Sequence, residues 1–146
     1  MKTLTVLTIA MLIASACATP SQMSADAEVK RLCAIDGGIK EYETVKLPAD
    51  KFNEWGQPNF YDPTEGENAL GPEYIFRSKT IVLREGDPTI VRHHHEVVRR
   101  SDNKKLGHST SYGRGGGDLP GPWHPSSFGC PEERGVIPLL TKIFQR

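Results

Sequence analysis

The chain has 146 residues, and its 18 lysines and arginines are balanced by 18 aspartates and glutamates. This length fits one domain. The neutral balance argues against nucleic acid as a partner, because binding phosphates requires a concentrated basic surface. Apolar residues make up 37% of the chain, with 14 glycines and 11 prolines, so we expect a modest core with many loops.

The N-terminal stretch has the layout of a secretory signal peptide. Lys2 precedes an uncharged apolar run over residues 4–13, and small residues at 14–16 lead to Cys17. A transmembrane anchor is the competing interpretation, but spanning a bilayer needs about 20 apolar residues and this run is shorter. We therefore predict a cleaved signal peptide over residues 1–16.

Cys17 follows its small residues in a way that resembles the lipobox of bacterial lipoproteins. The resemblance implies that Cys17 is acylated through its sulfur and becomes the mature N-terminus, and Ala18 after it implies an outer-membrane destination. More than one acyl chain gives stable anchoring, at about 0.8 kcal/mol per buried methylene. Cleavage near Ala16 or Ala18 without lipidation is the alternative interpretation. We expect a lipidated tether over 17–25 and one globular domain over 26–146.

Cys33 and Cys130 are the two remaining cysteines, and export would place them where disulfides persist. We predict that they form a disulfide. Closing a loop of this length stabilises the fold by about 4 to 5 kcal/mol on the chain-entropy model. Two buried free thiols are the alternative, and a metal site is disfavoured because neither cysteine has a second Cys or His at ligand spacing.

The first part of the domain is expected to hold a helix, a strand and a long loop. Apolar residues at helical spacing predict a helix over about 26–35. The β-branched and aromatic content of residues 39–47 favours a strand. One or two helical turns are expected within 48–56. Residues 56–73 are rich in turn formers and predict a surface loop, whose aromatic pair Phe60-Tyr61 packs on its own domain.

The second part is more regular. Residues 74–112 hold three β-rich runs separated by turn signals at 85–88 and 101–104, which predicts a three-strand meander. Apolar residues in the tail, 135–146, recur at the spacing of a closing helix. The predicted fold is therefore α+β: a small antiparallel β-sheet of about four strands, with N-terminal and C-terminal helices packed on it and one disulfide.

Three consecutive histidines in the meander are the strongest candidates for chemistry. In a strand, His93 and His95 share one face and His94 points to the other. A two-residue turn after the second run would place His108 opposite Val97 and about 7 to 8 Å from His95. His93, His95 and His108 would then form a zinc or copper site. A register slip of one residue would remove His108 from that face, and ordinary surface histidines are the alternative.

Residues 113–130 are rich in glycine and proline. A phosphate-binding loop is disfavoured, because the required Lys-Ser/Thr pair is absent. On a structural interpretation, the glycines allow positive φ and the prolines stiffen the return toward Cys130. On a functional interpretation, a ligand-binding groove is formed by Arg114, Asp118, Trp123 and His124.

Two passages resemble segments of small uncharacterised lipoproteins of Gram-negative bacteria. The first is LCAIDGGIKEYETVKLP at 32–48, and the second combines RRSDNKKLG at 99–107 with GRGGGDLPGPWHPSSFGCP at 113–131. The resemblance implies an envelope location and pairing of Cys33 with Cys130. It brings no activity.

Two classes of function follow from the sequence. The first is a non-catalytic envelope lipoprotein, a binding or assembly accessory attached to the membrane by its lipid, with an envelope protein as partner and no cofactor. The second is a zinc- or copper-binding or hydrolytic periplasmic protein that uses the histidines, with His124 as a further candidate. We assign no catalytic residues, because nothing pairs a nucleophile with a base and an orienting acid in a recognisable order. We favour the first class.

Overall fold

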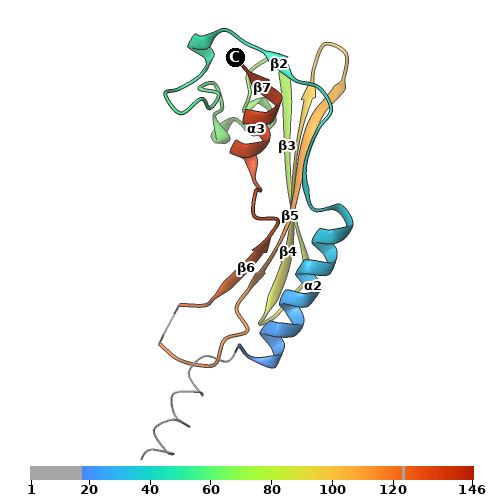
Figure 1. The fold of residues 1–146 in the computed structure, drawn as a ribbon, viewed down its shortest axis with the longest axis vertical. Coiled ribbons are helices and arrows are strands. Elements are labelled where there is room, and N and C mark those ends of the chain that lie inside the picture. Colours follow the sequence, from blue (N-terminus) through green and yellow to red (C-terminus); the bar gives the residue numbers. More distant parts are fainter. Residues whose placement is uncertain (1–17, 123) are drawn as a thin grey trace, which may run out of the picture.

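A long, mostly antiparallel sheet runs through the molecule in the computed structural model, which describes residues 18–122 and 124–146 (Figure 1). Its central strands are β3 (Tyr74–Arg84), β4 (Thr89–Arg99) and β5 (Lys104–Gly115). They form the predicted meander. Two short strands, β1 (Gly38–Glu41) and β6 (Ser127–Cys130), pair with different halves of β5 on its other side. The predicted signal peptide and Cys17 lie outside the described residues.

Helix α2 (Pro20–Asp36) begins six residues earlier than the sequence analysis expected. Thr19 forms a capping box with Gln22: the Gln22 backbone N–H donates to the Thr19 hydroxyl over 3.1 Å, and the Thr19 N–H donates to the Gln22 side chain over 2.9 Å. Pro20 occupies the first helical position, where a missing N–H costs nothing. Most of the stretch expected to be a tether, 17–25, is therefore helical.

The single strand expected over 39–47 is divided between two sheets. After β1, the backbone N–H groups of Tyr42 and Glu43 both donate to the carbonyl of Leu106, and the chain then leaves the main sheet. Residues Val45–Lys46 form β2, which pairs in parallel with β7 (Phe144–Gln145). The helical turn expected within 48–56 is the short 3₁₀ helix η1 (Ala49–Lys51), and the loop expected over 56–73 contains a second one, η2 (Pro63–Asn68).

The predicted closing helix is α3 (Val136–Ile143), and it ends in β7 rather than continuing to the terminus. The predicted disulfide between Cys33 and Cys130 is also confirmed. It joins α2 to β6 with a Cα–Cα distance of 6.2 Å. In Figure 1, α2 covers one end of the sheet, whereas α3 and the C-terminus lie at the other end.

Two groups of buried side chains lie on opposite faces of the sheet. Val97 belongs to one and Ile90 to the other, and an odd separation along one strand places side chains on opposite faces. The α3-side core consists of Phe52, Ala69, Leu70, Tyr74, Phe76, Val97, Leu106, Leu139, Leu140, Ile143 and Phe144. The α2-side core consists of Ala25, Val29, Ile90 and Tyr112, with Leu32, Phe128 and the disulfide packed against it.

Candidate functional site

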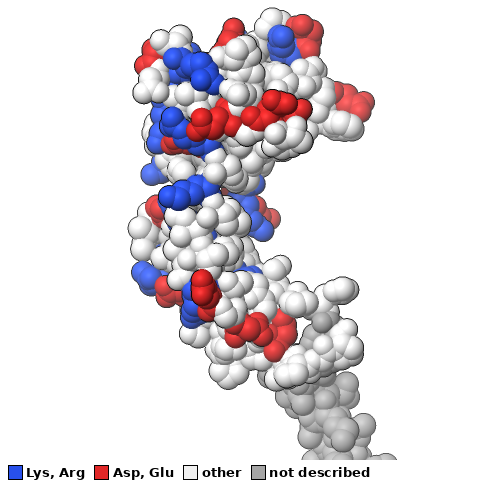
Figure 2. Space-filling view, turned by 180° about the vertical axis from the view of Figure 1, so that it is seen from behind, with Lys and Arg blue, Asp and Glu red and all other residues white. Residues whose placement is uncertain are grey.

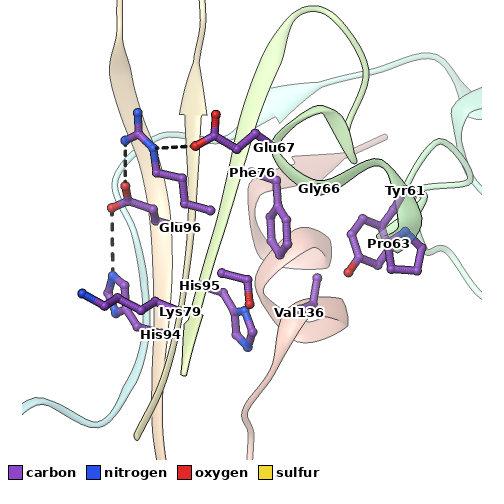
Figure 3. A pocket seen from close by; sticks show the side chains of 12 residues that line it. Tyr61, Pro63, Gly66, Glu67, Phe76, Lys79, His94, His95, Glu96 and Val136 are labelled. Carbon is purple, nitrogen blue, oxygen red and sulfur yellow. Dashed lines mark hydrogen bonds and ion pairs between the residues drawn. The ribbon is translucent and has the colours of Figure 1, made fainter. Parts of the chain in front are cut away.

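A groove of about 720 Å³ lies at the outer edge of β3, where the chain around β3 and β4 meets the distant start of α3 (Figure 3). One wall comes from the loop before β3, the floor from β3 and β4, and the opposite wall from the start of α3. We call this the edge groove. Its lining residues are Tyr61, Pro63, Gly66, Glu67, Phe76, Arg77, Ser78, Lys79, His94, His95, Glu96 and Val136.

The floor of the edge groove is aromatic. Phe76 and His95 project from neighbouring strands on the same sheet face, and their rings are stacked with centroids 6.0 Å apart and planes 9° from parallel. Tyr61 meets the edge of Phe76 at 5.6 Å. The predicted packing of the Phe60-Tyr61 pair is confirmed, since Phe60 also contacts Phe144 edge to face. A flat apolar or aromatic group fits such a floor, because aromatic rings prefer stacked and edge-to-face contacts.

His95 has a buried ring nitrogen that is not satisfied. Among the described residues, no group forms a hydrogen bond with its Nδ1 atom. Burial lowers the pKa of His95, and the nearby His93 and His94 lower it further, so the ring is neutral at pH 7. An unsatisfied buried polar atom costs about 1 to 3 kcal/mol.

Charged side chains line the other face of the same edge. Arg77 on β3 is 3.0 Å from Glu96 and 3.6 Å from Glu67, and Lys105 is 2.7 Å from Glu96. Burial alone would raise the pKa of Glu96, but hydrogen bonds from Lys105 and Arg77 outweigh it and leave the pKa lowered. Glu96 is therefore ionised at neutral pH. The edge groove combines an apolar floor with fixed charges across the strand.

The backbone edge of β3 is open beside the groove. β3 is the last strand of the main sheet, and within the described ranges no other strand pairs with its outer side. Glu67 of η2 forms an ion pair with Arg77 of β3, whereas the side chains of 78–84 are mainly exposed, including Val82 at 52% and Leu83 at 45%. Unpaired N–H and C=O groups on an edge strand can bind an added strand.

The predicted three-histidine face does not form, because the predicted register is wrong by one residue. Arg99 pairs with Lys104, so the turn holds four residues instead of two, and a bulge at Leu106 shifts the pairing again. His108 therefore lies opposite Glu96 and shares the face of His94, with ring centroids 5.3 Å apart. In the part of the chain that the structure describes, no group of three His, Cys, Asp or Glu side chains could hold a metal ion.

The other histidine contacts are made within the sheet. On one face His93 is hydrogen bonded to Thr80 at 2.9 Å, and on the other His94 is bonded to Thr110 at 2.8 Å. The hydroxyl of Tyr42 lies 3.2 Å from His108 Nδ1. Burial lowers the pKa values of His94 and His108, and nearby positive groups lower them further.

Arg114 and Asp118, proposed from the sequence as ligand-binding residues, hold the fold together. Arg114 is buried and its Nε lies 2.7 Å from an Asp26 oxygen on α2. The Ser126 backbone N–H donates to Asp118 over 2.7 Å and lowers the pKa of that carboxyl, which also accepts from Gln22. The remaining two residues are His124, which is exposed, and Trp123, which lies outside the described residues.

Sequence reasoning missed the edge groove, whose two walls, at Tyr61 and Val136, are about 70 residues or more apart along the chain. The only sequence signal was the expected packing of Tyr61. No protein-family model, curated protein or solved structure matches this chain. None of the described helices is long and apolar enough to cross a membrane.

Proposed function

We propose that this protein is a non-catalytic binding or assembly accessory of the bacterial envelope, anchored by lipid on Cys17, and that it holds an extended segment of a partner protein along β3. One observation carries the proposal: the open strand edge lies directly beside an apolar groove. Strand addition needs these two features, since main-chain hydrogen bonds supply affinity and a pocket for alternate side chains supplies specificity.

The geometry defines the kind of segment that fits. Its backbone would pair with β3 near Ser78 and Lys79, which follow the ion pair of Arg77 with Glu67 of η2. One apolar or aromatic side chain would then lie over Phe76 and His95, and its neighbour in sequence would point to the opposite face. On that face Lys79 is exposed and favours an acidic side chain. The expected ligand is therefore an extended peptide with alternating apolar and acidic residues.

A photo-crosslinking experiment in the native envelope tests this binding mode. A benzophenone amino acid replaces Ser78 in the groove or Ile35 on α2, where the side chain is 68% exposed. We expect a discrete protein adduct from position 78 and none from position 35. Equal adducts at both positions, or none at either, would contradict the proposal.

A groove-filling variant adds a second measurement. Val136→Trp places a large ring in the slot that the partner side chain would occupy. Burying an apolar side chain contributes about 1.5 to 3 kcal/mol, so the adduct from position 78 should fall about tenfold or more. Ile35→Trp is the matched control and should leave the adduct unchanged.

The lipid anchor is tested separately at Cys17. Cys17→Ser should release a soluble form or stall processing of the precursor, because no thiol remains to be acylated. The measurement is fractionation of the envelope together with the mass of the mature protein. A variant that matures and stays in the membrane fraction like the wild type would contradict lipidation.

A further inference from the structure

Three segments meet at the end of the molecule from which helix α2 starts. The Thr19 hydroxyl donates to the Gly117 carbonyl over 2.5 Å, and the Gln22 amide donates to Asp118 over 2.7 Å. Asp87, in the turn between β3 and β4, accepts a hydrogen bond from the backbone N–H of Gly117. We call this region, residues 19–23, 87–88 and 116–122, the α2-start end. These contacts fix the loop to the first turn of the helix.

The predicted lipid attachment point lies very close to this end. Only Ala18 stands between Cys17 and the capping residue Thr19, and the helix begins at Pro20. An extended chain spans at most about 3.6 Å per residue, so the helix starts within about 11 Å of the acylated cysteine. A domain held this closely cannot move away from the lipid surface.

The surface at the α2-start end suits contact with lipid. Met23 and Leu119 are each 63% exposed, and Pro120 and Pro122 are exposed beside Leu119. Side chains on a helix lean toward its N-terminus, which directs Met23 toward this end. Figure 2 shows that the surface next to the grey residues is mostly uncharged, with one acidic patch nearby. Exposed apolar side chains on a rigid support can enter the boundary between headgroups and acyl chains.

We infer that the α2-start end rests on the phospholipid surface, with Met23 and Leu119 inserted among the lipids. This inference depends on the proposed lipidation of Cys17. It sets the direction of the long sheet, because the turn at Asp87 then lies at the membrane, and Ser78 lies six residues before the end of β3 at Arg84. At about 3.3 Å per residue, this length of strand places the edge groove about 20 Å from the turn, facing the aqueous compartment.

Spin-label accessibility in liposomes tests the contact. The lipidated mature protein, with its disulfide intact, receives a single nitroxide through Leu119→Cys, Met23→Cys or the control Ile35→Cys, and is reconstituted into phosphatidylethanolamine and phosphatidylglycerol. The three native side chains have matched exposures of 63%, 63% and 68%. We expect collisions with a water-soluble nickel complex to be about threefold or more lower at 119 and 23 than at 35, because these sites enter the headgroup layer.

Two outcomes would overturn the inference and are distinguishable. Equal nickel accessibility at all three positions, with the protein still bound to the liposomes, would contradict the lipid contact but not the lipid anchor. Failure of the protein to float with the liposomes would overturn both the anchor and the contact.

Discussion

The two ends of the sheet are stabilised in different ways. The α3-side core contains eleven buried apolar or aromatic residues, joined by edge-to-face contacts such as Tyr74 with Phe144 at 5.0 Å. The α2-side core contains four, and it also carries the Cys33–Cys130 disulfide and the buried ion pair of Arg114 with Asp26. A small core supplies little burial energy, so a cross-link and a satisfied polar network supplement it.

This difference also separates the proposed tasks of the two ends. The edge groove is built on the apolar α3-side core, which supplies its aromatic floor through Phe76. The α2-start end is held by hydrogen bonds around Gln22, which is itself only 7% exposed. A binding slot benefits from well-packed walls, whereas an end next to a lipid anchor benefits from a rigid link.

Removal of the disulfide should have the largest effect. In Cys33→Ser/Cys130→Ser the chain loses a cross-link over 97 residues. The chain-entropy model gives a loss of about 4 to 5 kcal/mol in the free energy of unfolding, and measured losses are often smaller. Chemical denaturation measures the loss, and amide exchange should show α2 opening before α3. Reduced wild-type protein is the control; an unchanged denaturation midpoint would contradict the comparison of the two cores.

Truncations within the two cores should have smaller effects that differ from each other. Leu140→Ala leaves a cavity in the α3-side core, where Leu140 is fully buried, and should cost about 3 kcal/mol. Val29→Ala removes two methyl groups from the α2-side core and should cost about 2 kcal/mol. Both are measured by urea denaturation with the disulfide intact. A larger loss for Val29→Ala would reverse the proposed ranking of the cores.

The dependence of stability on pH should give the smallest effect. Burial lowers the pKa of His95, so below about pH 6.5 the unfolded chain binds more protons than the folded protein. The contribution of neutral His95 to the free energy of unfolding is therefore complete above about pH 6.5, and it is lost as the pH falls through the lowered pKa of His95 in the folded protein. His95→Leu keeps an apolar contact with Phe76 and should reduce the fall in melting temperature between about pH 7.5 and 5.5. An identical fall in melting temperature in both proteins would show that His95 does not contribute to the pH dependence of stability.

The start of helix α2 could have been predicted from the sequence, because the residues of its capping box are consecutive there. Thr19-Pro20-Ser21-Gln22 contains a capping residue, a proline at the first helical position and a glutamine three residues after the cap, and the helix starts there. The pairing register of β4 with β5, which decides which histidines share a face, could not be predicted in this way. It depended on the length of one turn and on a bulge at Leu106, and the face that His108 occupies reverses with a shift of one residue.

The sequence by itself determined the α+β class, the three-strand meander, the closing helix and the pairing of Cys33 with Cys130. These features follow from local periodicity, turn residues and the number of cysteines, all of which can be counted along the chain. Only the tertiary structure decided the edge groove and the two opposed cores. Tyr61, Phe76 and Val136 meet because sheet order and register bring them together, and both depend on contacts between distant residues.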